Sequence, residues 1–385
     1  MKRRRWIAGA CAHCALLATA GVRAQAEWAP PPRFARPDVG SDEGGLWAMM
    51  DREETRLRRS PFRMRDEGLQ DYLQALACKL GGEHCPDIRV YPVRTPFFNA
   101  SMAPNGMMVV WSGLLLRVDN EAQLCAVMAH EVAHFLQRHT LARLRDAKQR
   151  SAFGSFFLAF GVVGAMATMA TLAGTFGFSR DQEREADSIG LLLLERAGYD
   201  PREAARVWDN LLAEVNANPA VEKNAPNPML ATHPAAAERA RVLADLAAGR
   251  GGRLGRTEYL RQIAPLRFSL LDDELKRGRH PESLALLDRM LTLQPGHPEL
   301  LYFRGETRRL RAAAGDADAA LADLKSAAAA GGEPPAVHRA LGYLYRSLEQ
   351  PEASRLAFQT YLDKDPAAPD AGLIRHYVNE GKPAS

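Results

Sequence analysis

The sequence predicts a mainly α-helical protein with a small β-sheet, organised as two domains. A helix-compatible segment with two histidines spans residues 121–143, and two short alternating stretches before it are typical of strands. The last third of the chain repeats with a period of about 34 residues, which is typical of stacked helix pairs. A mature length of about 360 residues suffices for two domains that each bury a core.

Residues 1–26 have the features of a secretory signal peptide. Four cations, Lys2 to Arg5, precede an apolar stretch, and Ala24-Gln25-Ala26 supplies a small-x-small cleavage site. We therefore expect cleavage, export and a periplasmic location. An uncleaved amino-terminal anchor is the alternative.

The charge balance gives no reason to expect a nucleic-acid partner. The whole chain has 50 Lys and Arg against 46 Asp and Glu, a net charge of +4. Five of these cations and none of the acids lie in residues 1–26, so the mature chain carries 45 cations and 46 acids. The basic character belongs to the export segment, and the mature protein is close to neutral.

The stretch before the two histidines contains an arm, a helix and two strands. Residues 27–60 are rich in Pro, Arg and Asp and predict an extended arm. Residues 66–80 predict a helix, and residues 87–93 and 107–111 predict strands joined by a loop. The predicted helix has leucines on one face: Leu69, Leu73, Leu76 and Leu80.

Three cysteines remain after the signal peptide. Cys78 and Cys85 flank a Gly-Gly turn and could form a disulfide in an oxidising periplasm. Cys125 lies on the histidine-containing segment, where we expect a small buried apolar residue rather than a ligand.

Residues 129–136 read A-H-E-V-A-H-F-L and contain the pattern H-E-x-x-H. On a helix, His130 and His134 fall on one face one turn apart, so both imidazoles can reach one tetrahedral zinc ion. Glu131 projects beside them and can take a proton from a metal-bound water. The alternative is a buried helix that carries two histidines by chance.

A second acidic helix can complete such a site. The stretch S-R-D-Q-E-R-E-A-D-S-I-G, residues 179–190, predicts a helix that ends near Ala197 before Gly198. Glu183 and Asp187 share a face of it, so Glu183 can supply a third ligand and Asp187 can orient a ligating histidine. Glu185 points away and is the less favoured ligand, and a solvated charged face is the alternative for the whole stretch.

His233 lies in A-T-H-P-A-A-A-E-R, after a loop over residues 216–228 that is rich in Pro and Asn. It could approach the metal as a fourth ligand or stabilise a developing oxyanion. A histidine at the start of a surface helix is the alternative.

Residues 151–179 contain no charged side chain. The run is long enough for one membrane span of about 20 residues, but one crossing would separate His130 and His134 from Glu183. We therefore expect a helical hairpin that is buried or makes peripheral contact with a membrane.

A glycine-rich stretch, residues 247–257, predicts the boundary between a domain over 61–250 and a repeat domain over 258–385. The clearest repeat spans residues 335–368, with Leu341-Gly342, Tyr345, Phe358 and Pro366 at the spacing of a tetratricopeptide repeat. Such repeats form binding surfaces, and a plain helical bundle is the alternative.

Four motifs together resemble the zinc endopeptidases related to the CAAX prenyl protease and the membrane heat-shock protease, including periplasmic members with carboxy-terminal tetratricopeptide repeats. The motifs are H-E-V-A-H-x-x-x-R-H from His130, S-R-x-x-E-x-E-A-D-x-x-G from Ser179, T-H-P from Thr232, and N-A-x-x-x-P-x-G from Asn99. Asn105 stands where the family commonly has glycine.

The resemblance implies a zincin-like (gluzincin) metalloprotease domain and one zinc ion per chain. It implies His130, His134 and Glu183 as ligands, Glu131 as catalytic base, and a histidine at position 233 that coordinates the zinc and holds the enzyme latent. It also implies a strand that pairs with extended substrate: Met107, Met108, Val109, Val110 and Trp111.

From this resemblance we expect peptide hydrolysis on misfolded or stalled envelope and outer-membrane proteins, with the repeats recruiting substrates or an assembly partner. Two other classes of function stay open. One is a chaperone-like assembly factor whose protease site is kept shut by His233. The other is a metal hydrolase that acts on a non-peptide amide.

Overall fold

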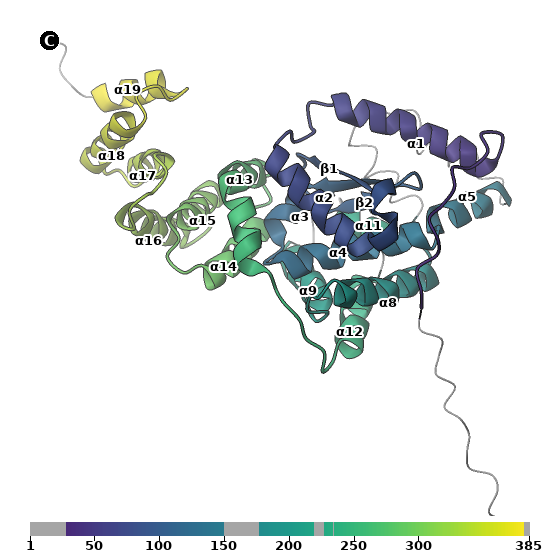
Figure 1. Ribbon diagram of the computed structural model, residues 1–385. Helices are drawn as coiled ribbons and strands as arrows, with labels where there is room; N and C mark the ends of the chain where they lie inside the picture. Colours follow the sequence, from purple (N-terminus) through teal and green to yellow (C-terminus); the bar gives the residue numbers. More distant parts are fainter. Residues whose placement is uncertain (1–27, 150–176, 219–226, 234, 381–385) are drawn as a thin grey trace, which may run out of the picture. The chain divides into compact units, whose positions relative to one another are not determined.

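The computed structural model describes residues 28–149, 177–218, 227–233 and 235–380, and it is mainly helical with one small sheet, as predicted (Figure 1). The predicted signal peptide, most of the run 151–179 and most of the loop 216–228 lie outside these residues. Residues 33–385 cluster as one compact unit, whereas residues 28–32 contain neither helix nor strand. Within the described ranges, none of the helices has both the length and the apolar character that a membrane crossing requires.

The first helix, α1, spans Asp42–Arg59, so the prediction of an extended arm over 27–60 is wrong there. Ser41 caps the helix, and acidic residues in the first turn and basic residues in the last turn favour the helix dipole. The helix was not predicted because its apolar face is narrow and the surrounding sequence is rich in Pro and Arg. That face packs against helix α5, His139–Gln149, in one cluster: Leu46, Met49, Met50, Leu141 and Leu144.

A buried carboxylate fixes α1 to the sheet. Glu54 accepts hydrogen bonds from Arg89 at 2.7 Å to each oxygen and from the Tyr91 hydroxyl at 2.7 Å. Burial alone would raise the pKa of Glu54, but these donors and the charges of Arg89 and Arg58 lower it to about 2. In the folded protein this carboxylate therefore stays ionised at pH values well below those at which a glutamate is ordinarily protonated.

Helix α2, Glu67–Gly81, is the predicted leucine helix: its four leucines are buried and Asp66 caps its first turn. A short 3-10 helix, Gly82–Asp87, follows it, and a disulfide joins Cys78 to Cys85. Cys125 is free and buried, as predicted.

The sheet has three strands in the order β1-β3-β2. Strands β1, Arg89–Val93, and β3, Met107–Trp111, confirm the two predicted strands and pair in parallel, with Arg89 opposite Met107. Strand β2, Ala100–Met102, lies in the predicted loop and pairs antiparallel with β3, with Ser101 opposite Val109. Because β3 is hydrogen-bonded along both edges, the prediction that Met107–Trp111 pairs with substrate is wrong.

Helix α3, Ser112–Arg117, leads into α4, Glu121–Leu136, which is buried on every face. The predicted helix over 121–143 is not continuous. Arg138 has a left-handed backbone, with φ of +55°, and the chain turns there before α5. The turn brings α5 against α1 and places His139 directly after it.

Four further helices precede the glycine-rich stretch in the described residues. Helix α8, Arg180–Arg196, is the helix predicted for this stretch; Ser179 caps its start, and it ends before Gly198, whose φ is +78°. Helix α9 spans Glu203–Asn216, the short α11 spans Pro228–Thr232, and α12 spans Ala236–Leu246. Helix α8 packs on α4, and α9 packs on both α4 and α12.

In the described part of the predicted repeat region, residues 258–380, the chain is helical apart from short turns, and consecutive helices pack on one another. Gly305 and Gly342 lie where an added Cβ would come within 3 Å of Leu324 and Phe358, so each glycine permits a close helix contact. The identity of the repeats stays a prediction. The helices are α13 Arg256–Lys276, α14 His280–Leu293, α15 Pro298–Arg311, α16 Asp316–Ala329, α17 Ala336–Ser347, α18 Pro351–Lys364 and α19 Ala371–Asn379.

A buried ion network joins these helices to the preceding ones. Arg117 of α3 donates at 2.7 Å to Glu214 of α9 and at 2.7 Å to Glu274 of α13. Arg289 of α14 donates to Glu214 at 2.8 Å. These buried ion pairs therefore link four helices across the predicted domain boundary: α3, α9, α13 and α14.

We predict that Glu54→Gln lowers the free energy of unfolding at pH 7 by about 3 kcal/mol, given ~1.36 kcal/mol per unit of pKa shift. A folded-state pKa of about 2 against the ordinary 4.5 means that the wild type has this stability above pH 4.5 and loses it as the pH falls towards 2. Urea unfolding from pH 7 to pH 2 should therefore show the two proteins converging.

Glu53→Gln is the matched control, because Glu53 makes only a surface ion pair with Arg56. Its effect should stay within about 1 kcal/mol. A constant difference between Glu54→Gln and the wild type across this pH range would show that the Glu54 charge does not hold α1.

Candidate metal centre

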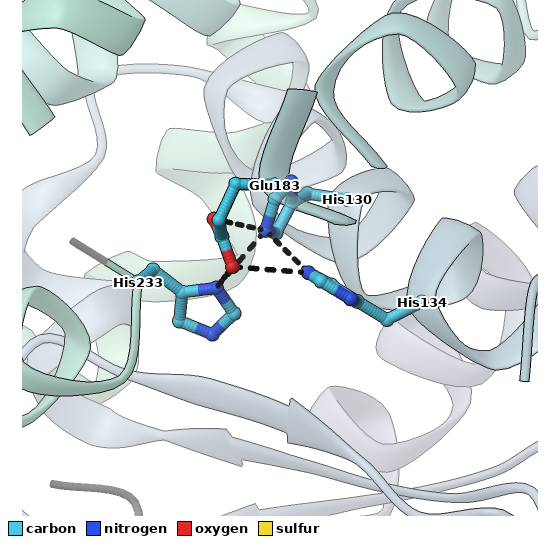
Figure 2. Close-up of side chains that lie close together, drawn as sticks. All are labelled: His130, His134, Glu183 and His233. Atoms are coloured by element: carbon cyan, nitrogen blue, oxygen red, sulfur yellow. Dashed lines mark hydrogen bonds and ion pairs between the residues drawn. The ribbon is translucent and has the colours of Figure 1, made fainter. Parts of the chain in front are cut away.

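Two histidines on α4 form one side of the candidate site. Asn120 caps α4, and its side chain accepts a hydrogen bond from the backbone N–H of Gln123. His130 and His134 lie one turn apart and both are buried, and their Nε2 atoms are 3.0 Å from one another (Figure 2). The predicted shared face is therefore present.

Helix α8 brings Glu183 to the same point. A capping box between Ser179 and Gln182 fixes the start of α8 one turn before Glu183. Gly190 lies against α4, and a Cβ there would be 3.2 Å from the backbone nitrogen of His130. Glu183 lies 3.5 Å from the Nε2 of His134 through Oε1 and 3.5 Å from the Nε2 of His130 through Oε2.

His233 reaches the same centre from the end of α11. Asn227 caps this helix, and the backbone N–H of His233 donates to the carbonyl of Met229 at 2.9 Å. The Nδ1 atom of His233 lies 2.9 Å from Oε1 of Glu183 and 3.1 Å from Nε2 of His130 (Figure 2). His233 is buried, so a surface cap histidine is excluded.

The donor atoms of His130, His134, Glu183 and His233 lie within 4.8 Å of one another. Two ligands of a tetrahedral ion with bonds of ~2.0–2.1 Å are roughly 3.3–3.4 Å apart. The shortest separations found here, from 2.9 Å for His233 to Glu183 up to 3.5 Å for His134 to Glu183, lie around that value. Imidazole nitrogen and carboxylate oxygen are also donors that zinc prefers, so these residues fit one zinc ion.

Comparison with known proteins gives the family of this region. Residues 63–247 match Peptidase family M48. This segment is an M48 peptidase domain. The four donor residues of the candidate metal site, His130, His134, Glu183 and His233, all lie within the matched segment.

Three relatives illustrate how much of the chain is matched. The beta-barrel assembly-enhancing protease of Escherichia coli is 33% identical over 226 residues, 51% of this chain and 44% of that protein. The protein of that name from Yersinia pestis is 32% identical, over 57% of this chain and 49% of its own. The mitochondrial metalloendopeptidase OMA1 of Arabidopsis thaliana is 35% identical over 40% of this chain and 30% of its own. The chain spans less than half the length of these relatives.

Glu131 of the M48 domain stands beside the donor set. It is buried, and its Oε1 has no hydrogen-bond partner among the described residues. The Nε2 atom of His233 lies 3.5 Å from this oxygen, beyond hydrogen-bond distance. Burial raises the pKa of Glu131, and the nearby histidines only partly oppose that shift.

Asp187 contacts His130 at the ring nitrogen that faces away from the candidate metal position. Its Oδ1 lies 3.0 Å from the Nδ1 atom of that ring, which leaves Nε2 towards the candidate metal position. Burial raises the pKa of Asp187, but hydrogen bonds from Arg239 and His130 outweigh burial and lower it to about 2. Burial also lowers the pKa of His134 well below its ordinary value, which keeps that ring neutral and able to ligate.

Arg239 is a site residue that was not predicted from the sequence. It donates to Asp187 at 2.8 Å and lies 2.8 Å from Oε2 of Glu183, and its guanidinium stacks 4.3 Å from the centre of the Trp208 ring. The sequence carried a signal for it. Arg239 falls on the apolar face of α12, and a cation on such a face implies a buried anion. The other buried members of that face are Ala236, Ala240 and Leu243.

We predict that Arg239→Met lowers the free energy of unfolding of the metal-free protein by about 3–5 kcal/mol, because it leaves two buried carboxylates without their cation. Arg241→Met, on the exposed side of the same helix, should change it by less than about 0.5 kcal/mol. Denaturant unfolding in the presence of a chelator measures both. Equal stability of the two variants would contradict this role for Arg239.

Proposed function

We propose that the protein is a zinc-dependent endopeptidase of the cell envelope, with His130, His134 and Glu183 as ligands and Glu131 as general base. One observation carries the proposal: beside a buried donor set for one metal lies a carboxylate oxygen, Oε1 of Glu131, that has no hydrogen-bond partner among the described residues. A structural zinc site has no need of such an oxygen, whereas hydrolysis requires a base at that position.

The chemistry follows from these residues. Zinc in such a site makes water a stronger acid and polarises a peptide carbonyl. Glu131 takes the proton from the attacking water and returns it to the leaving amine nitrogen. The raised pKa of Glu131 favours the first of these steps, because a carboxylate with a raised pKa is a stronger base than an ordinary one.

An extended polypeptide can reach this centre along the outer edge of β2, with which no strand of the described residues pairs. The pairing of Ser101 with Val109 turns the backbone groups of Ala100 and Met102 away from β3. Strand β2 packs on α4, and a small pocket lined by Met102, Pro104 and His134 adjoins it. We therefore assign substrate pairing to β2.

We predict that Glu131→Gln retains zinc and lowers the cleavage of an unfolded protein such as casein by at least about 10²–10⁴-fold, the usual contribution of a general base. Zinc content is measured on the purified full chain, and His130→Ala is the matched control that should lose zinc. Cleavage at the wild-type rate by Glu131→Gln would remove the proposed base. It would also favour a reaction in which another residue accepts the proton.

His233 is proposed to keep the site latent. Three protein ligands leave a zinc position open, and a fourth ligand closes it. The Nδ1 atom of His233 lies at ligand distance from the donor set, while its Nε2 faces Glu131 at 3.5 Å. In this position His233 excludes both a catalytic water and access to the base.

We predict that His233→Ala raises cleavage, including self-cleavage, by about tenfold or more, which corresponds to a closed state favoured by at least ~1.4 kcal/mol. Zinc should remain bound through the other ligands. Lost cleavage with retained zinc would show instead that His233 stabilises the oxyanion. An unchanged rate would leave it no role in the reaction.

The substrate and location are proposed from the relatives and the sequence. Two relatives are named as beta-barrel assembly-enhancing proteases, which supports a role in outer-membrane protein assembly. The predicted export segment and the Cys78–Cys85 disulfide support an oxidising periplasm. We propose misfolded or stalled outer-membrane proteins as substrates, recruited through the helical region over 258–385.

A chaperone-like assembly factor is the second candidate function. The position of His233 favours it, because a site shut by a fourth ligand leaves the rest of the chain free to bind without cleaving. Complementation of an assembly defect by Glu131→Gln would support this function over proteolysis.

A further inference from the structure

Two residues of the recognised motifs, His139 and Glu185, have no role in the function proposed above. His139 follows the turn after α4 and is buried, with 5% of its side chain exposed. Glu185 lies on α8 between Glu183 and Asp187 and has 49% of its side chain exposed. The two come from segments 46 residues apart and meet beside the ring of His134.

The contacts form a chain of three groups. The Nδ1 atom of His134 lies 2.8 Å from the Nδ1 atom of His139. The Nε2 atom of His139 lies 3.2 Å from Oε2 of Glu185. Each distance is that of a hydrogen bond, so a surface carboxylate connects through one imidazole to a proposed metal ligand.

The protons in this chain have one consistent arrangement. An ionised carboxylate only accepts hydrogen bonds, so the Nε2 of His139 must carry a proton and donate it to Glu185. In the neutral ring the Nδ1 of His139 is then bare and accepts a hydrogen bond from the Nδ1–H of His134. His134 is left with a lone pair on Nε2, the atom 3.0 Å from His130 and 3.5 Å from Glu183.

We propose that Glu185 and His139 form a positioning pair that holds His134 in the tautomer with the proton on Nδ1 and its ring aimed at the metal position. The proposal rests on the proposed zinc-dependent function. It gives each α4 histidine its own carboxylate: Asp187 contacts His130 directly, at 3.0 Å, and Glu185 acts on His134 through His139.

Two features of the backbone and packing support a positioning role. Arg138 adopts a left-handed conformation, with φ of +55°, which is unfavourable for a non-glycine residue. That turn returns His139 to the ring of His134. Phe178 constrains the His134 ring from another direction: its ring stacks on His134 with centroids 3.8 Å apart and planes inclined by 23°. The His134 ring is therefore held on its face and at its edge.

The test uses two variants of one shape. In His139→Asn, the amide oxygen can take the place of Nδ1 and accept from His134, whereas His139→Leu has the same branching and no acceptor. The zinc dissociation constant of the full chain, measured by competition with a chromogenic chelator, should rise about 10–100-fold in His139→Leu and stay near the wild-type value in His139→Asn. Thermal unfolding of the metal-free variants checks that both fold.

Substitutions of Glu185 test the proposal independently of residue 139. Glu185→Ala should weaken zinc binding, and Glu185→Gln should restore part of it because the amide oxygen still accepts from His139. Asp181→Ala on the same helix, where 92% of the side chain is exposed, is the control with no effect. Glu185→Ala added to His139→Leu should cause little further loss, since both act through one contact.

The visible absorption of the cobalt-substituted protein reports the ligand geometry directly. Its bands should shift in His139→Leu and match the wild type in His139→Asn. Equal zinc affinity in the Leu and Asn variants, whether at the wild-type value or equally reduced, overturns the proposal, because it would show that only the size of residue 139 matters. Zinc affinity is measured without substrate, so this result is independent of whether Glu131 serves as the base.

Discussion

The structure depends on the close crossing of α4 and α8 at Gly190. The absent side chain lets the backbone of α8 approach the backbone of His130, where a Cβ would be 3.2–3.5 Å from the nearest atoms. Glu183 and Asp187, nearer the start of α8, then reach the two ring nitrogens of His130, Nε2 and Nδ1 respectively. A larger residue at position 190 would separate the helices and with them the histidines and the carboxylates, which local helix geometry alone cannot bring together.

Burial makes the electrostatics of this site restrictive. Glu131, Glu183 and Asp187 are all withdrawn from water, and Arg239 is the buried cation that faces two of them. An ionised carboxylate in such surroundings is costly unless paired. The M48 domain thus arranges its charges in two groups. Asp187 and Glu183 are held ionised by Arg239 and the histidines, and Glu131, whose Oε1 is unpaired, has its pKa raised.

Buried charges are also paired in the ion network around Arg117, outside the candidate metal site. Glu214, near the end of α9, is held by Arg117 and Arg289, so the helices after the glycine-rich stretch are bonded to the element that precedes the segment carrying His233.

Features that depend on local spacing could be predicted from the sequence. His130, Glu131 and His134, and likewise Glu183 and Asp187, follow from residues four apart on a helix, and the two longer strands follow from alternation. Tertiary structure decided what depends on elements far apart in the chain. It placed β3 in the centre of the sheet, brought Arg239 to Asp187 across 52 residues and His139 to Glu185 across 46, and showed α1 as a helix. The physical reason is that strand order and buried charge pairing arise from contacts between segments, and no local period in the sequence records them.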